Sequence, residues 1–274
     1  MEKIGIRNYP AINQFLRNAK KDLAKRTRRG WLEQGRLIGA IGRARNGSKT
    51  TDEAIARAYD EEYGKKARYG YASAILCPEG FSLITGYEAR DARGLSIIDV
   101  GAGSNEFLRF CRDTLHVPIE HLHGTDVSAA SRDIIASDGF HAHLGRLETL
   151  QLPQQAFDLV YLSYFIDYDT NQAGTFASAI DCAKPGGRIV LEGLFPVRPF
   201  ALLGKDRNSF RFVTKGRSVN EDIELVTESF RTIGVEKKRN VRLVRIVTGR
   251  RYVQSHYGFR ELPSYFLVFE VMGL

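Results

Sequence analysis

The feature that most constrains the fold of this chain is a repeated alternation, from residue 95 onward, of short apolar runs and segments of helical length. The apolar runs are residues 95–100, 121–125, 141–144, 157–162 and 188–191. The intervening segments include residues 105–114 and 128–137. Such alternation is typical of βαβ units, because two parallel strands need a crossover connection, usually a helix. The sequence therefore predicts an α/β fold with a mostly parallel sheet.

Two more apolar runs, residues 240–247 and 264–271, follow a predicted helix over residues 218–234. The segment between these two runs is too short for a crossover helix of normal length, which favours an antiparallel pair. All the runs together predict a Rossmann-like, doubly wound sheet of seven strands with this antiparallel pair at the C-terminal end.

The first third of the chain has a different pattern. Pro10 can open a helix, and five apolar residues then follow at helical spacing, namely Ile12, Phe15, Leu16, Ala19 and Leu23. Glycines interrupt the pattern before Thr50 and Glu53 offer a capping box for another helix. We therefore expect two parts. Residues 1–90 would be an N-terminal helical cap or lid, and residues 91–274 would be the main domain, with a substrate-lid insertion at residues 192–217.

The composition fits a globular protein in the cytoplasm. Hydrophobic residues make up 43% of the chain, and no uncharged apolar run reaches the roughly 18 residues of a membrane span, so we expect no membrane partner. Residues 1–21 carry charges where a secretory signal has its apolar segment. An organellar transit segment is the alternative interpretation of this basic, amphipathic start, and Glu2 and Asp22 argue against it.

Cysteines and histidines give no sign of a metal site. Cys77, Cys111 and Cys182 are far apart and form no Cys-x-x-Cys pair, so we expect buried thiols rather than disulfides or zinc ligands. The histidines follow no His-Glu-x-x-His pattern. We therefore expect no bound metal.

The net charge of +8 is unevenly distributed. Residues 17–45, 198–217 and 231–260 together carry a net charge of +21, so the rest of the chain is acidic. Basic surface on an acidic body would suit nucleic acid, an acidic small molecule or an anionic surface. A solvated, solubilising face is the alternative interpretation.

The strongest chemical signal is an apolar strand that runs directly into a glycine turn. Residues 97–105 read Ile-Ile-Asp-Val-Gly-Ala-Gly-Ser-Asn and precede a predicted helix. Glycines let the backbone approach a ligand closely, and the helix start presents unpaired amides, so the turn predicts a nucleotide-type site. Asp126 ends the next strand, where a carboxylate can accept both hydroxyls of a ribose. A helix N-cap is the alternative role for Asp126.

Two ligands compete for this arrangement, a nicotinamide dinucleotide and S-adenosylmethionine. The dinucleotide fingerprint needs a third glycine where this chain has Glu106, and a carboxylate beside a pyrophosphate is unfavourable. Asp99, at the end of the strand, suits a ligand with an ammonium group and a sulfonium. The residues therefore favour S-adenosylmethionine.

At this point the sequence resembles the class I S-adenosylmethionine-dependent methyltransferase family, from about residue 59 to the end. Asp99, Gly101 and Gly103 look like the first motif, Asp126 like the ribose-binding acid, residues 156–160 like the fourth-strand block, and residues 183–188 like the turn before the fifth strand. The resemblance implies an enzyme with S-adenosylmethionine as cofactor, and a purely structural role for residues 185–187. The cofactor-binding residues that we expect on this basis are Asp99, Gly101, Ala102, Gly103, Asn105, Asp126, Val127, Leu147, Glu148, Ser163, Tyr164 and Tyr63.

The sequence departs from the family pattern at two places. Asn105 stands where the first motif usually has a third glycine, and asparagine tolerates left-handed backbone better than most residues. The acid that contacts the adenine amino group is replaced within residues 145–148, so Arg146 and Glu148 are alternative neighbours of the adenine.

Residues 163–169, Ser-Tyr-Phe-Ile-Asp-Tyr-Asp, follow the fourth predicted strand of the main domain, where α/β enzymes place substrate groups. They lack the Asn or Asp, two prolines and aromatic residue of nucleic-acid base methyltransferases, which disfavours methylation of an exocyclic base amine. We expect Asp167, Tyr168 and Asp169 to be catalytic, with an aspartate accepting or orienting the proton of an N–H or O–H nucleophile. Capping of the helix that begins near Thr170 is the alternative role for either aspartate.

Aromatic residues flank the predicted site on both sides. Tyr59, Tyr63, Tyr69 and Tyr71 lie upstream, where similar enzymes have an aromatic lid, although simple helix packing is the alternative. Residues 192–217 interleave aromatic and cationic side chains, which suits a flat polar or anionic molecule and also RNA.

We therefore predict methyl transfer to nitrogen or oxygen of a small polar or heteroaromatic molecule, for example in secondary metabolism. The alternatives are an RNA or protein methyltransferase that uses the basic segments, and a non-catalytic S-adenosylmethionine-binding protein. The sequence leaves the oligomeric state open.

Overall fold

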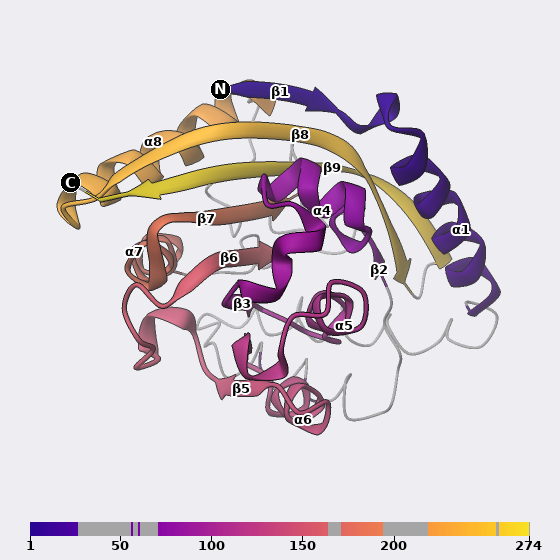
Figure 1. Ribbon diagram of the computed structural model, residues 1–274, viewed down its shortest axis with the longest axis horizontal. Helices are drawn as coiled ribbons and strands as arrows, with labels where there is room; N and C mark the ends of the chain where they lie inside the picture. Colours follow the sequence, from indigo (N-terminus) through magenta and orange to yellow (C-terminus); the bar gives the residue numbers. More distant parts are fainter. Residues whose placement is uncertain are drawn as a thin grey trace, which may run out of the picture.

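A nine-stranded mixed sheet organises the chain (Figure 1). The computed structural model describes residues 1–26, 56, 60, 71–163, 171–193, 219–255 and 258–273. The strands are β1 (Glu2–Gly5), β2 (Tyr71–Ala72), β3 (Ile97–Val100), β4 (Leu122–Asp126), β5 (His141–Leu144), β6 (Phe157–Ser163), β7 (Ala183–Gly193), β8 (Asn240–Ser255) and β9 (Gly258–Met272). The α-helices are α1 (Pro10–Arg26), α4 (Pro78–Thr85), α5 (Glu106–Asp113), α6 (Ala129–Ser137), α7 (Gln172–Cys182) and α8 (Val219–Glu236).

The strand order is β1-β8-β9-β7-β6-β3-β4-β5, and β2 pairs with β8 outside this path. Strands β7, β6, β3, β4 and β5 are parallel, whereas β9 runs antiparallel to both β7 and β8. These pairings confirm the predicted Rossmann-like α/β fold with an antiparallel C-terminal pair. Because the chain leaves β3 toward β4 and β5 and later returns to β6, the carboxyl end of β3 lies at a topological switch point, where such sheets bind ligands.

The predicted count of seven strands is too low, because the N-terminal segment contributes two more. Strand β1 pairs in parallel with β8, and β2 pairs antiparallel with Tyr252 and Val253. The expectation of a purely helical cap over residues 1–90 is therefore wrong at both strands, although α1 forms as predicted. Strand β1 reads Glu-Lys-Ile-Gly, which has no strand periodicity. It forms because β8 offers an otherwise open edge.

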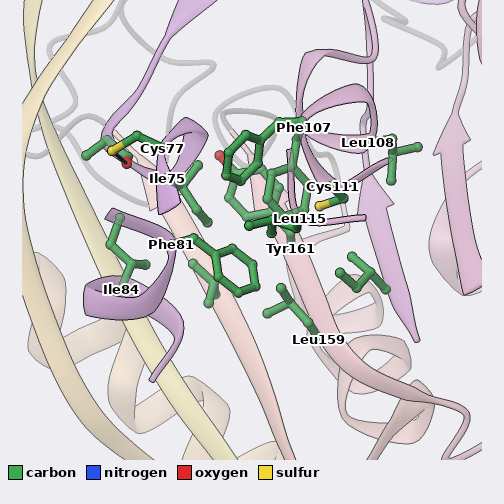
Figure 2. Packing of buried hydrophobic residues seen from close by; sticks show 14 of the residues in the cluster. Ile75, Cys77, Phe81, Ile84, Phe107, Leu108, Cys111, Leu115, Leu159 and Tyr161 are labelled. Carbon is green, nitrogen blue, oxygen red and sulfur yellow. Dashed lines mark hydrogen bonds between the residues drawn. The ribbon is translucent and has the colours of Figure 1, made fainter. Parts of the chain in front are cut away.

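Helices cover both faces of the sheet (Figure 1). Helices α1, α4, α5 and α6 contribute to one buried apolar cluster, and α7 and α8 contribute to the other. Figure 2 shows part of the first cluster, in which Phe107 of α5 packs against Tyr161 of β6, with ring centroids 4.3 Å apart. On the opposite face, Phe230 of α8 stacks between Phe176 of α7 and Phe269 of β9. Both faces of the central strands are thus dry, as a parallel sheet requires.

The hairpin of β8 and β9 is longer than the apolar runs predicted. Its outer part pairs Gly249 with Ser264 and ends at Ser255 and Gly258, beyond the residues that pair with β7. This outer part of the hairpin lies at the end of the sheet where the carboxyl ends of β6 and β7 also lie, because β8 runs parallel to β7. Figure 1 shows both long strands continuing toward α1. Residues 249–255 escaped prediction because they are rich in arginine and polar residues rather than apolar ones.

Three further findings concern the cysteines, a membrane span and a metal site. Cys77, Cys111 and Cys182 are free and buried, as predicted, and burial raises the pKa of Cys77 and of Cys182 to about 11. Within the described residues, no helix has the length and apolar character needed to cross a membrane. The described part of the chain also contains no group of three or more His, Cys, Asp or Glu residues placed to hold a metal ion.

Three histidines stack on the β4–β5 edge of the sheet. His123 Nδ1 lies 3.2 Å from His143 Nε2, and the rings of His123 and His141 stack with centroids 4.4 Å apart. Burial, and then the charges of His141, His143 and His121, lower the pKa of His123 to about 4. The folded protein therefore keeps His123 neutral over a pH range in which the unfolded chain binds a proton.

This histidine stack predicts a loss of stability in mild acid. The unfolded chain takes up the proton below about pH 6.5, so the folded state is penalised increasingly as the pH falls toward 4. We expect His123→Phe to reduce the drop in melting temperature between pH 7 and pH 5. The exposed His116→Asn should leave this drop unchanged. An equal drop in melting temperature in the wild type and in His123→Phe would contradict the assignment of this acid sensitivity to His123.

Candidate cofactor and active site

The glycine turn after β3 is held in shape by the end of β4. The amides of Gly101 and Ala102 both donate to Thr125 O, at 2.9 and 3.0 Å. Gly101 and Gly103 have φ angles of 72° and 56°, in the left-handed region that favours glycine. Because side chains with a Cβ resist this conformation, the two glycines are needed to bring the backbone of the turn to the switch point of the sheet.

Asn105 occupies a third left-handed position, with a φ of 73°, immediately before α5. Asn105 therefore adopts the left-handed backbone that asparagine was expected to tolerate. Its side chain is fully buried, and Nδ2 donates to Asp138 Oδ2 at 2.9 Å, at the end of α6. The amide nitrogen thus braces α5 against α6. The predicted cofactor contact of Asn105 stays a prediction.

Asp126 ties the turn and the next strand together. Its Oδ2 accepts from the amide of Gly103 at 3.0 Å, and its Oδ1 accepts from the amide of Ser128 at 2.9 Å. The N-cap of α6 is Ser128, whose Oγ accepts from the amide of Ser131, so Asp126 is not the capping residue. Burial raises the pKa of Asp126, while these hydrogen bonds oppose the rise. A carboxylate has about four acceptor positions, so Asp126 keeps capacity for hydroxyl donors.

Asp99 is buried near the end of β3, and one of its carboxylate oxygens has no partner among the described residues. Its side chain is 1% exposed, and within the described structure Oδ1 accepts no hydrogen bond. Burial is the first cause that raises the pKa of this carboxyl, and the nearby charge of Glu106 is the second. A buried acceptor without a donor is rare and costly, so its presence at a ligand-binding edge indicates a missing cationic or N–H donor.

The short helix η6 (Leu147–Thr149) follows β5 and contains the residues predicted to lie near an adenine. Leu147 is buried in the second apolar cluster. Glu148 pairs with Arg146 Nε at 2.5 Å and also accepts from Asn171 Nδ2 and Thr175 Oγ1 of the α7 region. Arg146 and Glu148 therefore join η6 to α7, and their distance from an adenine remains a prediction.

A buried polar cluster at the carboxyl ends of β6 and β7 was missed by sequence reasoning. At its centre, Glu192 is fully buried and receives hydrogen bonds from the hydroxyls of Ser73, Ser264 and Tyr161. Arg251 Nη1 lies 3.3 Å from Glu192 Oε2 and also donates to Ser163 Oγ at 3.3 Å.

The Arg251 guanidinium lies 3.8 Å from the centroid of the Tyr71 ring. Burial raises the pKa of Tyr71 well above its usual value, and the charges of Asp99 and Glu106 add to the rise. Tyr71 therefore lies within electrostatic reach both of the Glu192 cluster and of the carboxylates beside the glycine turn. The sequence analysis named Tyr71 only as one of the aromatic residues of a possible lid, and gave no sign of its contact with Arg251.

The structure places the remaining predicted residues as follows. Val127 is half-buried between Asp126 and the N-cap of α6, and Ser163 is the last residue of β6. Asn171 is the N-cap of α7, and its side chain accepts a hydrogen bond from the amide of Gly174. The N-cap is therefore neither Asp167 nor Asp169. The other predicted site residues, Tyr63, Tyr164, Asp167, Tyr168 and Asp169, and the upstream Tyr59 and Tyr69, lie outside the described residues.

Asp60 is a further acid at the site that the sequence did not single out. Its Oδ1 accepts from Ser128 Oγ at 2.7 Å and from the amide of Ala130 at 3.0 Å. The N-terminal segment thus reaches the start of α6, next to Asp126. Negative charge is favourable there because of the free amides at a helix N-terminus.

The residues present fit S-adenosylmethionine. Asp99 offers a buried, unpartnered carboxylate oxygen to a cationic group, Asp126 keeps acceptor capacity for ribose hydroxyls, and the glycine turn between them allows close approach. A diphosphate does not fit as well, because three carboxylates, from Asp99, Glu106 and Asp126, gather at this turn and would repel it.

The chain is similar to known proteins both in sequence pattern and in fold. Residues 67–242 match a family described as "Methyltransferase domain". Among solved structures, the [4+2]-cyclase SpnF is similar over 82% of this chain and 98% of its own, with a TM-score of 0.54 and 15% identity. A SAM-dependent methyltransferase from Aquifex aeolicus is similar over 78% of this chain and 98% of its own, with a TM-score of 0.48 and 13% identity. No curated protein sequence gives a significant match.

The family match covers well over half of the chain. The chain therefore belongs to the class I S-adenosylmethionine-dependent methyltransferase family. It is an enzyme, and its cofactor is S-adenosylmethionine.

The left-handed turn makes a prediction about Asn105. Asn105→Gly relieves the strained backbone but loses the bond to Asp138, so we expect the free energy of unfolding to stay within about 1 kcal/mol of wild type. Asn105→Ala loses the bond and keeps the strain, so it should be less stable by about 1–3 kcal/mol. Urea denaturation of both variants measures the difference. Equal stabilities of the two variants would show that the left-handed backbone carries no cost.

Proposed function

We propose that this methyltransferase transfers the methyl group to a nitrogen or oxygen atom of a small polar or heteroaromatic molecule. S-adenosylmethionine supplies an activated methyl group on a sulfonium. The observation that carries the proposal is the buried polar cluster of Tyr71, Arg251, Glu192 and Ser163 at the carboxyl ends of the strands. Polar groups gathered at this end of the sheet suit a compact acceptor with its own polar atoms.

The cofactor contacts proposed for this chain follow from the geometry of the turn. Asp126 would accept the ribose hydroxyls, Asp99 would accept from the ammonium of the methionine part, and the turn of Gly101 to Gly103 would lie against the cofactor. Val127 and Leu147 would contribute apolar contact near the adenine. With the cofactor so placed, its sulfonium would face the end of β6 and the Glu192 cluster.

The acceptor contacts are proposed on the same basis. The flat guanidinium of Arg251 lies against the Tyr71 ring, and Glu192 holds the guanidinium by an ion pair. Together they would form one planar wall of the acceptor site. Planar polar molecules pack well against such a wall. Alignment of nucleophile, methyl and sulfur would supply much of the rate enhancement. Asp167 or Asp169, with Tyr168 between them, is proposed to orient or accept the proton of the nucleophile.

RNA or protein methylation is the alternative, and described basic residues argue against it. Four described cations in α8, in the turn after it and in β8 are paired with acids. The pairs are Arg231–Glu228, Lys237–Asp181, Arg242–Glu270 and Arg245–Glu2. Paired cations have less to gain from phosphate contacts, because the neighbouring carboxylate already satisfies them.

Transfer of a labelled methyl group separates these readings. The purified protein would be incubated with methyl-labelled S-adenosylmethionine and, separately, with the small-molecule, RNA and protein fractions of a cell extract. We expect label in the small-molecule fraction alone, resistant to ribonuclease and protease. Label that ribonuclease or protease releases from the macromolecular fraction would overturn the proposed acceptor class.

The ribose assignment predicts a specific loss of binding. Asp126→Ala should weaken the binding of S-adenosylhomocysteine by about 1–3 kcal/mol, the range for a lost hydrogen bond to a charged group. Asp126→Asn keeps an oxygen that can accept from the amide of Gly103. Comparison of the two variants therefore separates the effect of losing the charge from the effect of losing the hydrogen bond that holds the turn. Calorimetry gives both dissociation constants. An unchanged constant in Asp126→Ala would count against the assignment.

The acceptor wall predicts that stability and acceptor binding can be separated. Arg251→Gln leaves Glu192 buried without its cation and should cost about 3–5 kcal/mol of stability. Adding Glu192→Gln should restore much of that stability, but the KM for the acceptor should stay at least about tenfold raised, the equivalent of one lost hydrogen bond to a charged group. Arg242→Gln, an exposed position in the same strand, is the control. A double variant with a normal KM would remove Arg251 from the acceptor site.

A further inference from the structure

The first turn of α6 is held by two aspartates from distant parts of the chain. Asp126 Oδ1 accepts from the amide of Ser128 at 2.9 Å. Asp60 Oδ1 accepts from Ser128 Oγ at 2.7 Å and from the amide of Ala130 at 3.0 Å. Asp60 and Ser128 are 68 residues apart in the chain, so only the tertiary structure brings this carboxylate to the helix. One residue, Ser128, therefore contacts both aspartates.

The contact with Asp60 fixes the orientation of the Ser128 hydroxyl. A serine hydroxyl has one proton to donate, and here Asp60 accepts it. The same hydroxyl oxygen accepts from the amide of Ser131 and thereby caps the helix. Ser128 is fully buried, so without Asp60 its proton would stay unpaired or turn toward another acceptor, at a cost in free energy. Asp60 thus holds the N-cap residue in its present arrangement.

The start of α6 also supports the glycine turn. Ser131 is fully buried, and its Oγ donates to Gly103 O at 2.7 Å. The amide of Gly103 in turn donates to Asp126 Oδ2 at 3.0 Å. The helix start, the glycine turn and Asp126 therefore form one connected set of hydrogen bonds, which Asp60 joins from the N-terminal third of the chain. Because the bonds of a buried network depend on one another's geometry, a shift of Ser128 changes the position of the Asp126 carboxylate.

We propose that Asp60 is a positioning residue for cofactor binding, which acts through Ser128 to hold the Asp126 carboxylate in the orientation that receives the ribose hydroxyls. This inference rests on the ribose contact proposed above for Asp126. Asp60 acts without touching the cofactor. Its contribution comes from its two hydrogen bonds rather than from its charge, because the hydroxyl of Ser128 and the amide of Ala130 require only an oxygen acceptor. The N-terminal third of the chain thereby takes part in cofactor affinity.

Calorimetric titration with S-adenosylhomocysteine separates the hydrogen bonds of Asp60 from its charge. Asp60→Ala removes both bonds and should weaken binding between about threefold and tenfold, because the acceptor for the ribose is then less well placed. Asp60→Asn keeps an oxygen for both donors, so its dissociation constant should stay within about twofold of wild type. Asp133→Asn, at an exposed position of the same helix, is the matched control and should bind normally.

A double-mutant cycle tests whether the effect passes through Asp126. Asp126→Ala removes the ribose acceptor, so adding Asp60→Ala to it should cause little further loss of affinity. An equally large loss in the wild-type and Asp126→Ala backgrounds would overturn the positioning role, because general damage to the fold or a separate contact acts whether or not the ribose acceptor is present. Circular dichroism of each unliganded variant checks that it is folded.

Ser128→Gly provides a second test that does not alter Asp60. It removes the hydroxyl but keeps the amide that donates to Asp126, and glycine is tolerated at an N-cap. We expect it to weaken the binding of S-adenosylhomocysteine by a factor similar to that of Asp60→Ala. Normal binding by Ser128→Gly would overturn the proposal even if Asp60→Ala failed to fold.

The possible results also separate this proposal from the ribose assignment. An unchanged dissociation constant in Asp126→Ala would overturn the assignment, and the positioning role with it. Weakened binding in Asp126→Ala together with normal binding in Asp60→Ala would overturn the positioning role alone. Binding by Asp60→Asn that is as weak as binding by Asp60→Ala would also overturn it, because the charge of Asp60 would then be what the cofactor requires.

Discussion

The hydrogen bonds between the glycine turn and the end of β4 are the constraint on which the site depends. Two amides of the turn donate to Thr125 O, and the amide of Gly103 donates to Asp126. These bonds hold three left-handed residues in place next to a buried carboxylate. They also bring together two strand ends whose positions in the sequence are far apart. The surface proposed to meet the cofactor is therefore built by backbone geometry first and by side chains second.

Charge divides the carboxyl edge of the sheet into two parts. Beside the turn, Asp99, Glu106 and Asp126 are acidic, and in the described part of the chain Asp99 Oδ1 accepts no hydrogen bond, which suits a cationic cofactor. Beyond them, Glu192 and Arg251 balance each other within a shell of hydroxyl groups. A balanced buried pair costs desolvation energy, but it holds a planar cation in one orientation. Under the proposed function, the first part would bind the cofactor and the second the methyl acceptor.

Local patterns predicted much of the fold and part of the site. The strands from 95 to 191 and the helices α1, α6 and α8 follow from periodicity and capping signals, because those signals depend on neighbouring residues. Asp126 was singled out because it ends a strand that follows a glycine turn, and the structure places it beside that turn. Strands β1 and β2 were missed because they exist only through pairing with β8. The outer half of β8 was missed because its arginine-rich sequence lacks the apolar run of a buried strand and is typical of loops or solvent-exposed faces.

The sequence by itself determined the order of the elements, the parallel core and the glycine turn, because hydrophobic periodicity and the left-handed backbone preference of glycine and asparagine act within a few residues. Only the tertiary structure decided which charged groups meet. Ser73, Tyr161 and Ser264 surround Glu192 from three different strands or connections, and Arg251 reaches the same place from the end of a long hairpin. Such meetings depend on strand order and register, which no local pattern encodes.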